Sequence, residues 1–500
     1  MKDIVVQAPR QGIAQSPHVG FGDCRNLDIF TSPGVVKLNN LVAKVSSTTV
    51  VTTVQWIVTN PATPAEKYAL DSAGKVYKST DTGASWTLMT GFGASGLGQG
   101  LAIWKNYLFV ARTTALDVCG DGTATGITNA NWTNDWTTNA LSSDALWHPM
   151  LVSKNDNKLY IGAGRYVFSL DEVTAQTFAP GNSATYTMTE QALDLPPNYR
   201  IKCIEELGNN LMLGTWQGTN VYDLRIADIF PWDRSATSFG QPITLNEHGV
   251  HALLNTGNSL IVLAGIGGTV YRSDGVNAIP IAQIPQSIAD ISGGKYLEWY
   301  PGAICNYKNR VFFGVSSGGS ATTLDGMGVY SLFQTGQGNI LTLEHGISTG
   351  NYGATTTVKI GAIHPVTRDN LLIGWRDDTT YGIDNQTVTS FNTSYSGYFT
   401  TPLYTVGSNQ QQHKFIEFEF QLARPLRANE GFKIDYRADL TASFTNITTI
   451  DFATFGAKLS HVFTLDATKG ADILALEQVQ FKVYLTGTTT TPSLKSVSIR

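Results

Sequence analysis

Histidines with metal-ligand spacing are the first candidates for chemistry in this sequence. Of the eight histidines, only His248 and His251 lie close together, in an H-x-x-H pattern with Glu247 beside them. Zinc hydrolases need further ligands and usually a helix that presents them. The flanking sequence ITLNEHGVHALLN is instead typical of a turn that enters a strand. We therefore expect one turn histidine, one histidine at the strand entry, and no metal site.

Neighbouring acidic residues are the next candidates, because glycoside hydrolysis uses two carboxyl groups across a cleft. Such pairs include Glu205-Glu206, Asp171-Glu172 and Asp377-Asp378. Neighbours on a strand point to opposite faces of the sheet, so adjacency does not create a catalytic pair. The glycines at 265–268 precede a strand-like segment rather than a helix, so they do not predict a phosphate loop. The sequence predicts no catalytic residue and no cofactor.

Tryptophans supply the remaining candidates for binding. Trp132, Trp136 and Trp147 lie in polar, aromatic-rich connecting segments. Such loops bind sugars or protein partners, because aromatic side chains make large contacts at low entropic cost. Packing between neighbouring sheets is the alternative, and we favour it for these tryptophans. The segment 231–234, which contains Trp232 and Arg234, is either a rigid exposed turn or a subunit contact in which Arg234 reaches across.

The elements that must position these residues are strands. Charged residues make up 15% of the 500 residues, below the roughly 25% of an average soluble protein. The chain is instead rich in Thr, Ser and Asn and contains 49 glycines. β-branched residues suit a pleated sheet, and Gly and Asn suit tight turns. The composition therefore predicts an all-β protein with many short strands.

Charge and cysteine content disfavour several classes of protein. A net charge of −5 without a Lys/Arg cluster disfavours a nucleic-acid groove, which needs a basic stripe. The four cysteines, Cys24, Cys119, Cys203 and Cys305, have no zinc or redox spacing, so we expect buried thiols. No segment approaches the ~20 apolar residues of a membrane span, and the first residues lack the apolar stretch of a signal peptide. We expect synthesis in a cytoplasm.

A repeated hairpin is the most informative pattern in the chain. An apolar strand, a short turn and a second strand, often ending in Val-Tyr, recur at 68–78, 107–118, 159–170, 211–224, 260–272, 310–331 and 371–384. The starts differ by 39, 52, 52, 49, 50 and 61 residues, which matches one four-stranded propeller blade. We predict a seven-bladed β-propeller, with six or eight blades as alternatives. The Gly after each apolar run is expected to permit a tight turn.

A second domain is expected after the propeller. From residue 401 the strands become longer and alternate, as in IEFEFQL, which is typical of a sheet with one wet face. This pattern predicts a C-terminal β-sandwich. A propeller also needs its first and last strands in one sheet, and segment 34–45 is a candidate for that closing strand. The predicted parts are an N-terminal segment with the closing strand (1–50), the propeller (51–390), a linker (391–406) and the sandwich (407–500).

One copy of the repeat carries a more specific motif. Ser79, Asp81, Gly83 and Trp86 fit the pattern S-x-D-x-G-x-x-W. This segment resembles the Asp-box hairpin of sialidase-like and related propellers. The resemblance implies that Ser79 and Asp81 bond the backbone of the turn while Trp86 packs beneath it. Sialidase activity would also need an arginine cluster and a Tyr–Glu pair, which the scattered arginines do not indicate.

A wider resemblance covers most of the chain. Its residues are Cys24-Arg-Asn-Leu-Asp28, Thr31-Ser-Pro-Gly-Val35, Trp147-His-Pro-Met150, Leu193-Asp-Leu-Pro-Pro-Asn-Tyr199, Tyr300-Pro-Gly-Ala303 and the closing PSLKSVSIR. These segments resemble propeller-containing virion proteins of tailed bacteriophages. The resemblance implies a structural part of a tail nozzle, tail tip or fibre attachment, assembled with copies of itself and other tail proteins in a symmetric ring. It carries over no functional residue.

Three classes of function therefore follow from the sequence. The leading one is a virion tail protein that is not an enzyme. The second is a module that binds host-surface glycans, with the loops around Trp132 to Trp147 as its site. The third is a sialidase-like glycosidase, which only the motif at 79–86 favours.

Overall fold

The computed structural model describes residues 4–7, 23–32, 34–45, 50–92, 96–120, 126–136, 141–142, 146–172, 186–218, 225–235, 237–284, 296–318, 324–335, 338–391, 397–405, 417–464 and 478–499. The chain forms two compact units, each built from separate stretches of sequence. The propeller unit contains Ala43–Gly328 and Ile347–Asn385. The sandwich unit contains Met1–Val42, Val329–Gly346 and Gln386–Arg500.

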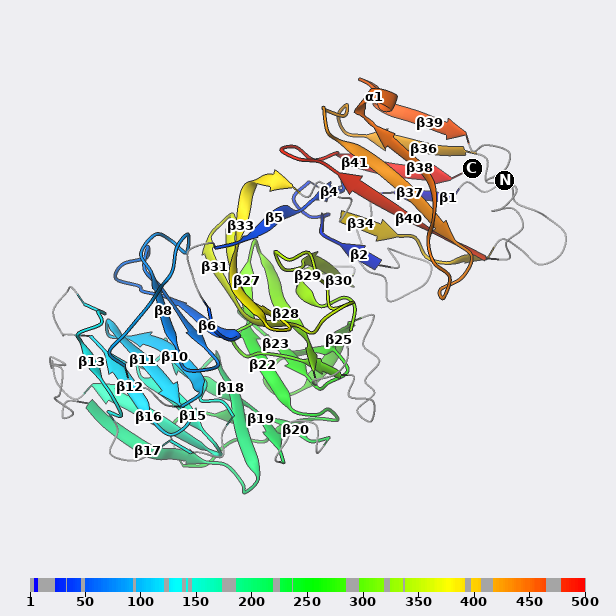
Figure 1. The fold of residues 1–500 in the computed structure, drawn as a ribbon. Helices are drawn as coiled ribbons and strands as arrows, with labels where there is room; N and C mark the ends of the chain where they lie inside the picture. Colours follow the sequence, from blue (N-terminus) through cyan, green and yellow to red (C-terminus); the bar gives the residue numbers. More distant parts are fainter. Residues whose placement is uncertain are drawn as a thin grey trace. The chain divides into compact units, whose positions relative to one another are not determined.

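Small antiparallel sheets follow one another along the propeller unit and form its blades (Figure 1). Blade one contains β6 (Val54–Thr59), β7 (Lys67–Asp71), β8 (Val76–Ser79) and β9 (Thr87–Leu88). Blade two contains β10 (Gly98–Trp104), β11 (Tyr107–Arg112), β12 (Leu116–Cys119) and β13 (Trp132–Thr133). Blade three contains β14 (Met150–Val152), β15 (Leu159–Ala163), β16 (Tyr166–Glu172) and β17 (Tyr186–Asp194).

The remaining blades continue this order. Blade four contains β18 (Tyr199–Leu207), β19 (Asn210–Gln217), β20 (Ala227–Trp232) and β21 (Ile243–Leu245). Blade five contains β22 (Val250–Asn255), β23 (Leu260–Ala264), β24 (Thr269–Ser273) and β25 (Ala278–Gln283). In blade six, β26 (Tyr296–Glu298) and β27 (Ile304–Tyr307) both pair with β28 (Arg310–Gly318). Blade seven contains β31 (Val358–Thr367), β32 (Asn370–Asp377), β33 (Thr380–Phe391) and β5 (Asn40–Lys44).

The first strands of the blades close a ring. Contacts join β6, β10, β14, β18, β22, β27 and β31 in sequence, and β31 contacts β6 again. Strand β5 completes blade seven, with the Val45 amide donating to the Ile383 carbonyl at 2.9 Å. A blade cannot bury both of its faces alone, so the closed ring supplies each sheet with a cover on both sides. The predicted seven-bladed propeller is confirmed.

The glycines of the repeats have two roles. Gly74 and Gly265 lie in the turn after the second strand with φ of +77° and +72°, as expected from the sequence, but other glycines do not. Each predicted hairpin begins in the second strand of its blade, and glycines such as Gly374 lie inside that strand rather than in the turn. A Cβ atom on Gly374 would stand 2.8 Å from the Cβ of Val54 in the neighbouring blade. The expectation of a tight turn was wrong here, because the missing side chain lets adjacent blades approach closely.

The sandwich unit has two packed sheets (Figure 1). One sheet has the order β1 (Ile4–Gln7), β41 (Leu494–Ile499), β36 (Glu417–Leu422) and β39 (Ser460–Thr464). The part of the other sheet that belongs to this unit has the order β29 (Gly328–Thr335), β30 (Gly338–His345), β2 (Asp23–Arg25), β34 (Gly397–Thr400), β40 (Gln478–Thr486), β37 (Gly431–Arg437) and β38 (Thr445–Asp451), and β35 (Tyr404–Thr405) pairs with β40. Strands β3 (Leu27–Asp28) and β4 (Lys37–Leu38) form a separate pair, and α1 spans Phe452–Phe455.

Aromatic rings fill the space between these two sheets. The Phe418 ring meets the Phe481 ring edge-on at 5.4 Å, and Phe420 stacks on Phe432 at 5.4 Å. Aromatic pairs in these arrangements add to the stability that burial alone provides. The predicted β-sandwich is therefore confirmed.

The extent of the sandwich unit differs from the expectation. Residues 397–405 of the predicted linker (391–406) form β34 and β35 in the second sheet, while 392–396 and 406 lie outside the described residues. Strands from the N-terminal segment and the hairpin of β29 and β30 also belong to this unit. The cysteine prediction is confirmed, because all four are buried free thiols. In the described part of the chain, no helix is long and apolar enough to cross a membrane.

Candidate functional site

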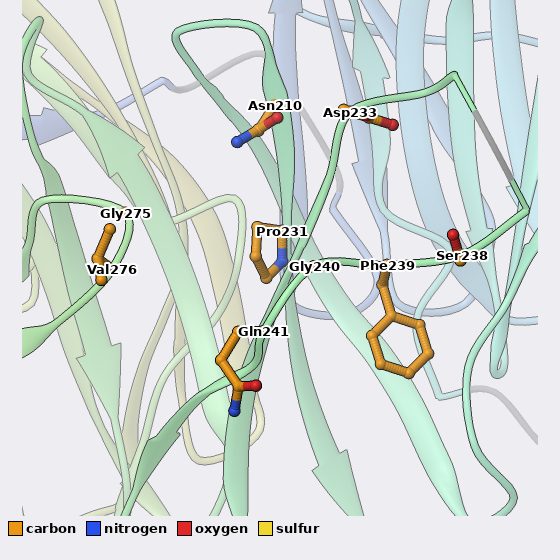
Figure 2. Close-up of a pocket in the computed structure, with 9 residues that line it drawn as sticks. All are labelled: Asn210, Pro231, Asp233, Ser238, Phe239, Gly240, Gln241, Gly275 and Val276. Atoms are coloured by element: carbon orange, nitrogen blue, oxygen red, sulfur yellow. The ribbon is translucent and has the colours of Figure 1, made fainter.

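A cavity of about 440 Å³ opens between blades four and five. Its lining residues are Asn210 on β19, Pro231 on β20, Asp233, Ser238, Phe239, Gly240 and Gln241 after β20, and Gly275 and Val276 between β24 and β25. Figure 2 shows the turn of Gly275 and Val276 on one side of Pro231 and the ring of Phe239 on the other. We refer to residues 233–242 as the blade-four loop; residue 236 within it is not among the described residues.

The blade-four loop folds back onto the strand it leaves. The Gly240 amide donates to the Pro231 carbonyl at 2.7 Å, which closes the base of the loop. The ring of Phe239 packs edge-on against buried Phe230, with ring centroids 4.8 Å apart. These contacts give the wall of the cavity a fixed backbone.

Trp232 and Arg234, two of the candidates from the sequence, anchor this loop from inside. Trp232 is buried and meets the Tyr160 ring of blade three edge-on at 5.9 Å. The Arg234 guanidinium donates to Glu206 Oε1 at 2.8 Å and to Ser153 Oγ at 2.9 Å. The description of 231–234 as an exposed turn or subunit contact needs correction, because both side chains are used within the propeller.

The pair formed by Arg234 and Glu206 is nearly removed from water. Their side chains are 10% and 9% exposed. Burial alone would raise the pKa of Glu206, but hydrogen bonds from Ser153 and Lys154 and the charge of Arg234 lower it. A paired, ionised carboxylate therefore ties the blade-four loop to blades three and four.

In the described structure, the polar side chains that line the cavity, unlike Arg234 and Glu206, are not paired with each other. Asp233 accepts hydrogen bonds from the Ser235 amide at 2.9 Å and from its hydroxyl, which lower the pKa of Asp233. Within the described residues, the side chains of Asn210, Ser238 and Gln241 have no protein hydrogen-bond partner. The cavity thus combines an ionised carboxylate with amide and hydroxyl groups that are open to a ligand.

A second group of polar residues lies where the first strands of the blades begin. In blades one, two, four and five, the register between the first and second strands shifts by one residue. The extra residues on the first strands are Gln55, Gln99, Lys202 and His251. Such a β-bulge redirects the extra residue out of the regular alternation. The bulges therefore place polar side chains at the inner strands of the ring.

Two of these bulge residues bind each other. The Nζ atom of Lys202 lies 2.7 Å from Nδ1 of His251, whose Nε2 atom lies 2.8 Å from the His248 carbonyl. Nε2 must donate to the carbonyl, so Nδ1 accepts from Lys202 and the imidazole is neutral. Burial lowers the pKa of Lys202 to about 8, and burial with the Lys202 charge lowers the pKa of His251 well below its usual value.

Aromatic side chains complete this group across the ring. The Lys202 ammonium lies 5.3 Å from the centre of the Trp147 ring, and Trp147 meets Tyr300 edge-on at 5.6 Å. Trp147 precedes blade three and Tyr300 belongs to blade six, so this contact crosses the middle of the ring. We call these four buried side chains the axial cluster: Trp147, Lys202, His251 and Tyr300. The axial cluster is a packed polar core that ties four blades together.

The turn 79–86, which we call the blade-one turn, binds its own backbone. The Gly83 amide donates to Ser79 Oγ at 2.9 Å, and the Ser85 amide donates to Asp81 Oδ1 at 2.8 Å. Trp86 is buried and donates from Nε1 to the Gly83 carbonyl at 3.2 Å. These contacts fill the inside of the turn and leave its polar groups little capacity for a ligand.

The three aromatic candidates of the connecting segments are also buried. Trp132 packs against Phe92 with ring centroids 5.5 Å apart, and Trp136 meets Phe109 edge-on at 6.4 Å. Trp147 belongs to the axial cluster described above. The structure thus uses these tryptophans for packing, the alternative favoured from the sequence, and not for a surface site.

The histidine pair forms no ligand set. His251 is held by Lys202 and by the backbone of His248. Among the residues that the structure describes, no group of three or more His, Cys, Asp or Glu side chains is placed to hold a metal ion.

Sequence reasoning missed Asn210, Phe239 and Gln241 of the cavity and Lys202 of the axial cluster. The cavity residues carry no motif, since two separate blades bring them together. Lys202 has a weak signal, because a polar residue interrupts an apolar segment ahead of the repeated hairpin, as Gln55 and His251 also do. A bulge can be expected at such a position, but its binding partner cannot.

Comparisons with known proteins identify no family for the chain. No protein-family model and no curated protein sequence matches it. A structure of YCF48 bound to D1 peptide is 10% identical, with a TM-score of 0.44 over 72% of this chain and 97% of its own. The β-propeller domain of Myceliophteria thermophila Cps50 (Swd1) is 13% identical, with a TM-score of 0.43 over 69% of this chain and 99% of its own. Because these scores are below 0.5, neither the fold nor the function of the chain rests on them.

Proposed function

We propose that this chain is a structural component of a tailed-phage virion, located in the tail as a nozzle, tip or fibre-attachment protein. It assembles with copies of itself and with other tail proteins into a symmetric ring, and it catalyses no reaction. The phage context comes from the sequence resemblance described above. The structural role is supported by how the chain connects its two units.

The interlaced chain is the observation that carries this proposal. The chain passes from one unit to the other four times, after Val42, Gly328, Gly346 and Asn385. A binding module on a flexible tether needs only one such connection. Four crossings join the two units through several separate segments of the chain, which suits a protein that transmits force within a particle.

Hydrogen bonds between neighbouring blades give further support. The Asn155 side chain donates to the Gly208 carbonyl at 2.8 Å, and the Asn255 side chain donates to the Glu206 carbonyl at 2.6 Å. The Asn306 side chain in turn donates to the Asn255 carbonyl at 3.1 Å. Blades three to six are thus joined by side-chain bonds in addition to apolar packing, which favours a rigid ring.

The residues that carry the phage resemblance also support a structural role. Cys24 and Leu27 are buried, and the Asn26 amide donates to the Leu343 carbonyl of β30 at 2.8 Å. Asp28 accepts hydrogen bonds from the Phe30 and Thr31 amides at 2.9 Å each. The motif therefore organises the sandwich unit. We likewise interpret the blade-one turn as an Asp-box hairpin whose role is to hold its own backbone.

Strand β39 is the place where we expect one copy to meet another. It is the last strand of its sheet and, among the described strands, pairs only with β36. Three large apolar side chains near it, Phe452, Leu459 and Val462, are exposed. Exposed end strands with apolar side chains are sites of association with further chains.

Mass photometry and negative-stain imaging of the purified chain test this proposal. We expect a ring of defined copy number, formed alone or after addition of a neighbouring tail protein. Val462→Lys should abolish the ring by placing a charge in the contact, while Val51→Lys serves as the control, because both valines are 46% exposed. A monomer under both conditions, or rings that the Val462→Lys variant still forms, would contradict this assembly.

A further inference from the structure

We propose that the cavity between blades four and five binds a neutral carbohydrate of one or two sugar rings. Asn210 and Gln241 bind its hydroxyl groups, and Phe239 and Val276 contact its carbon-bound hydrogens, with Pro231 between them. This inference is independent of the virion role, since a tail protein can assemble without recognising any sugar.

The size of the cavity suits such a ligand. Its volume of about 440 Å³ lies in the lower part of the range of roughly 300–1,000 Å³ found for small-molecule sites. The lining is mixed rather than apolar, with four polar side chains and two glycines beside three apolar residues. A sugar ring presents the same mixture, because its hydroxyl groups surround faces of carbon-bound hydrogen.

The apolar part of the lining combines one buried residue with two that are open to solvent. Phe239 is half-buried and held against Phe230. Pro231 is buried and has a fixed ring, and Val276 is 75% exposed at the opposite wall. Rigid apolar groups bind with little loss of side-chain entropy. These residues therefore form a preformed contact surface for the face of a sugar ring.

The polar part of the lining matches hydroxyl groups. Amide side chains such as Asn210 and Gln241 offer both donors and acceptors. Neighbouring hydroxyl groups of a sugar likewise donate and accept. The two amides have no protein partner within the described residues, so a ligand would not have to displace any internal hydrogen bond.

Charge at the cavity favours a neutral ligand over an acidic one. Asp233 is the one ionisable side chain among the nine lining residues. The next residue, Arg234, is paired with Glu206 and turned into the propeller. A uronate or phosphate group would therefore meet a negative charge without a compensating cation.

Both walls of the cavity are held in place before any ligand binds. In blade five, the carboxylate of Asp274 accepts hydrogen bonds from the Val276 amide at 2.9 Å and the Asn277 amide at 2.7 Å. Gly275 has a φ of +95° and therefore adopts a backbone conformation that favours glycine. A wall fixed in this way loses little entropy on binding.

Saturation-transfer NMR with the full chain tests the proposal. The probes are cellobiose, maltose, lactose and N,N′-diacetylchitobiose at millimolar concentration, with a glucuronate-containing disaccharide and a set of short peptides as comparators. We expect transfer to at least one neutral disaccharide. No transfer to any of the four, or stronger transfer to the acidic disaccharide or the peptides, would overturn the assignment.

Variants locate the binding in this cavity. Asn210→Ala combined with Gln241→Ala should weaken the affinity for the best disaccharide about tenfold or more, because two hydrogen-bonding groups are lost. Gln478→Ala is the control, since Gln478 is also an exposed glutamine without a protein partner but lies in the sandwich unit. It should leave the affinity within twofold. Equal affinity of the double variant and the wild type would show that any sugar binds elsewhere, and would disprove the site.

The outcome is separate from that of the assembly experiment. Ring formation without sugar binding would leave the structural role intact and refute this inference. Sugar binding by a chain that stays monomeric would support this inference and contradict the proposed assembly. The melting temperature of each variant confirms that lost binding does not reflect lost folding.

Discussion

The blade-one turn and the blade-four loop occupy the same place in their blades, between the third and fourth strands, yet they are built in opposite ways. In the blade-one turn, Ser79 and Asp81 bind the turn's own backbone, and Trp86 fills the space beneath it. In the blade-four loop, Trp232 and Arg234 are bound to neighbouring strands at the start of the loop, and the remaining polar groups line a cavity.

The position of the anchoring residues explains this difference. Trp86 is the last residue of its turn and packs inside it, with Tyr77 and Leu372 in the same apolar cluster. Trp232 precedes its loop and packs outward on Tyr160 of blade three. A loop whose anchors lie at its start leaves the rest of its interior open. We infer that this order, and not the number of polar residues, separates a structural turn from a candidate binding loop on this scaffold.

Among the changes that test this comparison, the removal of Trp86 should lower the free energy of unfolding most. Trp86→Ala leaves a cavity beneath the blade-one turn and should lower the free energy of unfolding by about 4 kcal/mol. Trp86→Phe should lower it clearly less, because the ring refills most of the space. Urea unfolding followed by circular dichroism measures both values. A loss of less than about 1 kcal/mol for Trp86→Ala would mean that the hydrogen bonds of Ser79 and Asp81 hold the turn without Trp86.

The second largest loss of stability should follow from the removal of Arg234, an anchor of the blade-four loop. Arg234→Ala leaves the buried carboxylate of Glu206 without its cation, which should lower the free energy of unfolding by about 3 kcal/mol. In a Glu206→Gln background the same change should cost much less, since no buried charge is then left unpaired. Equal losses in both backgrounds would show that Arg234 acts through packing rather than through its charge.

The repeat made most of the propeller predictable from the sequence. Each hairpin pairs neighbouring residues, so its apolar pattern reports its structure directly. A closing strand could be proposed within 34–45 because a ring requires one, and it forms at Asn40–Lys44, while Lys37–Leu38 pairs with β3. The origin of strands β2 and β30 in the sandwich unit could not be predicted, because Arg25 pairs with Leu343 across most of the chain and neither segment carries a periodic signal.

The candidate site was harder to predict, for a related reason. Trp232 and Arg234 were noticed for their side chains, which the fold uses internally. The residues that face the cavity, such as Asn210 and Gln241, are ordinary polar residues of strand ends and loops. They become a site only when two blades meet, and no local pattern in the sequence describes that meeting.

Acid titration should show that the blade-one turn and the blade-four loop each contain an aspartate with a lowered pKa. Hydrogen bonds from Ser235 lower the pKa of Asp233, and those from Ser85 lower the pKa of Asp81 although burial opposes them. A lowered folded pKa gives stability that is present above the unfolded value of about 4 and is lost as the pH falls through the folded value. Ser85→Ala should raise the pKa of Asp81, and Ser235→Ala should raise that of Asp233. Carboxyl ¹³C shifts between pH 2 and 6 measure both, and an ordinary pKa in the wild type would refute the shared capping.

The smallest effect should come from the cavity residues themselves. Combining Asn210→Ala with Gln241→Ala should change the free energy of unfolding by less than about 0.5 kcal/mol, because neither side chain binds another protein group in the described structure. Asp81→Ala in the blade-one turn should cost about 1 kcal/mol or more, because its carboxylate holds the Ser85 amide. Urea unfolding of the two variants under the same conditions gives the contrast. Polar groups that a fold does not need for stability remain available to a ligand, so a large loss for the cavity variant would turn the blade-four loop into a second structural turn and remove the distinction between them.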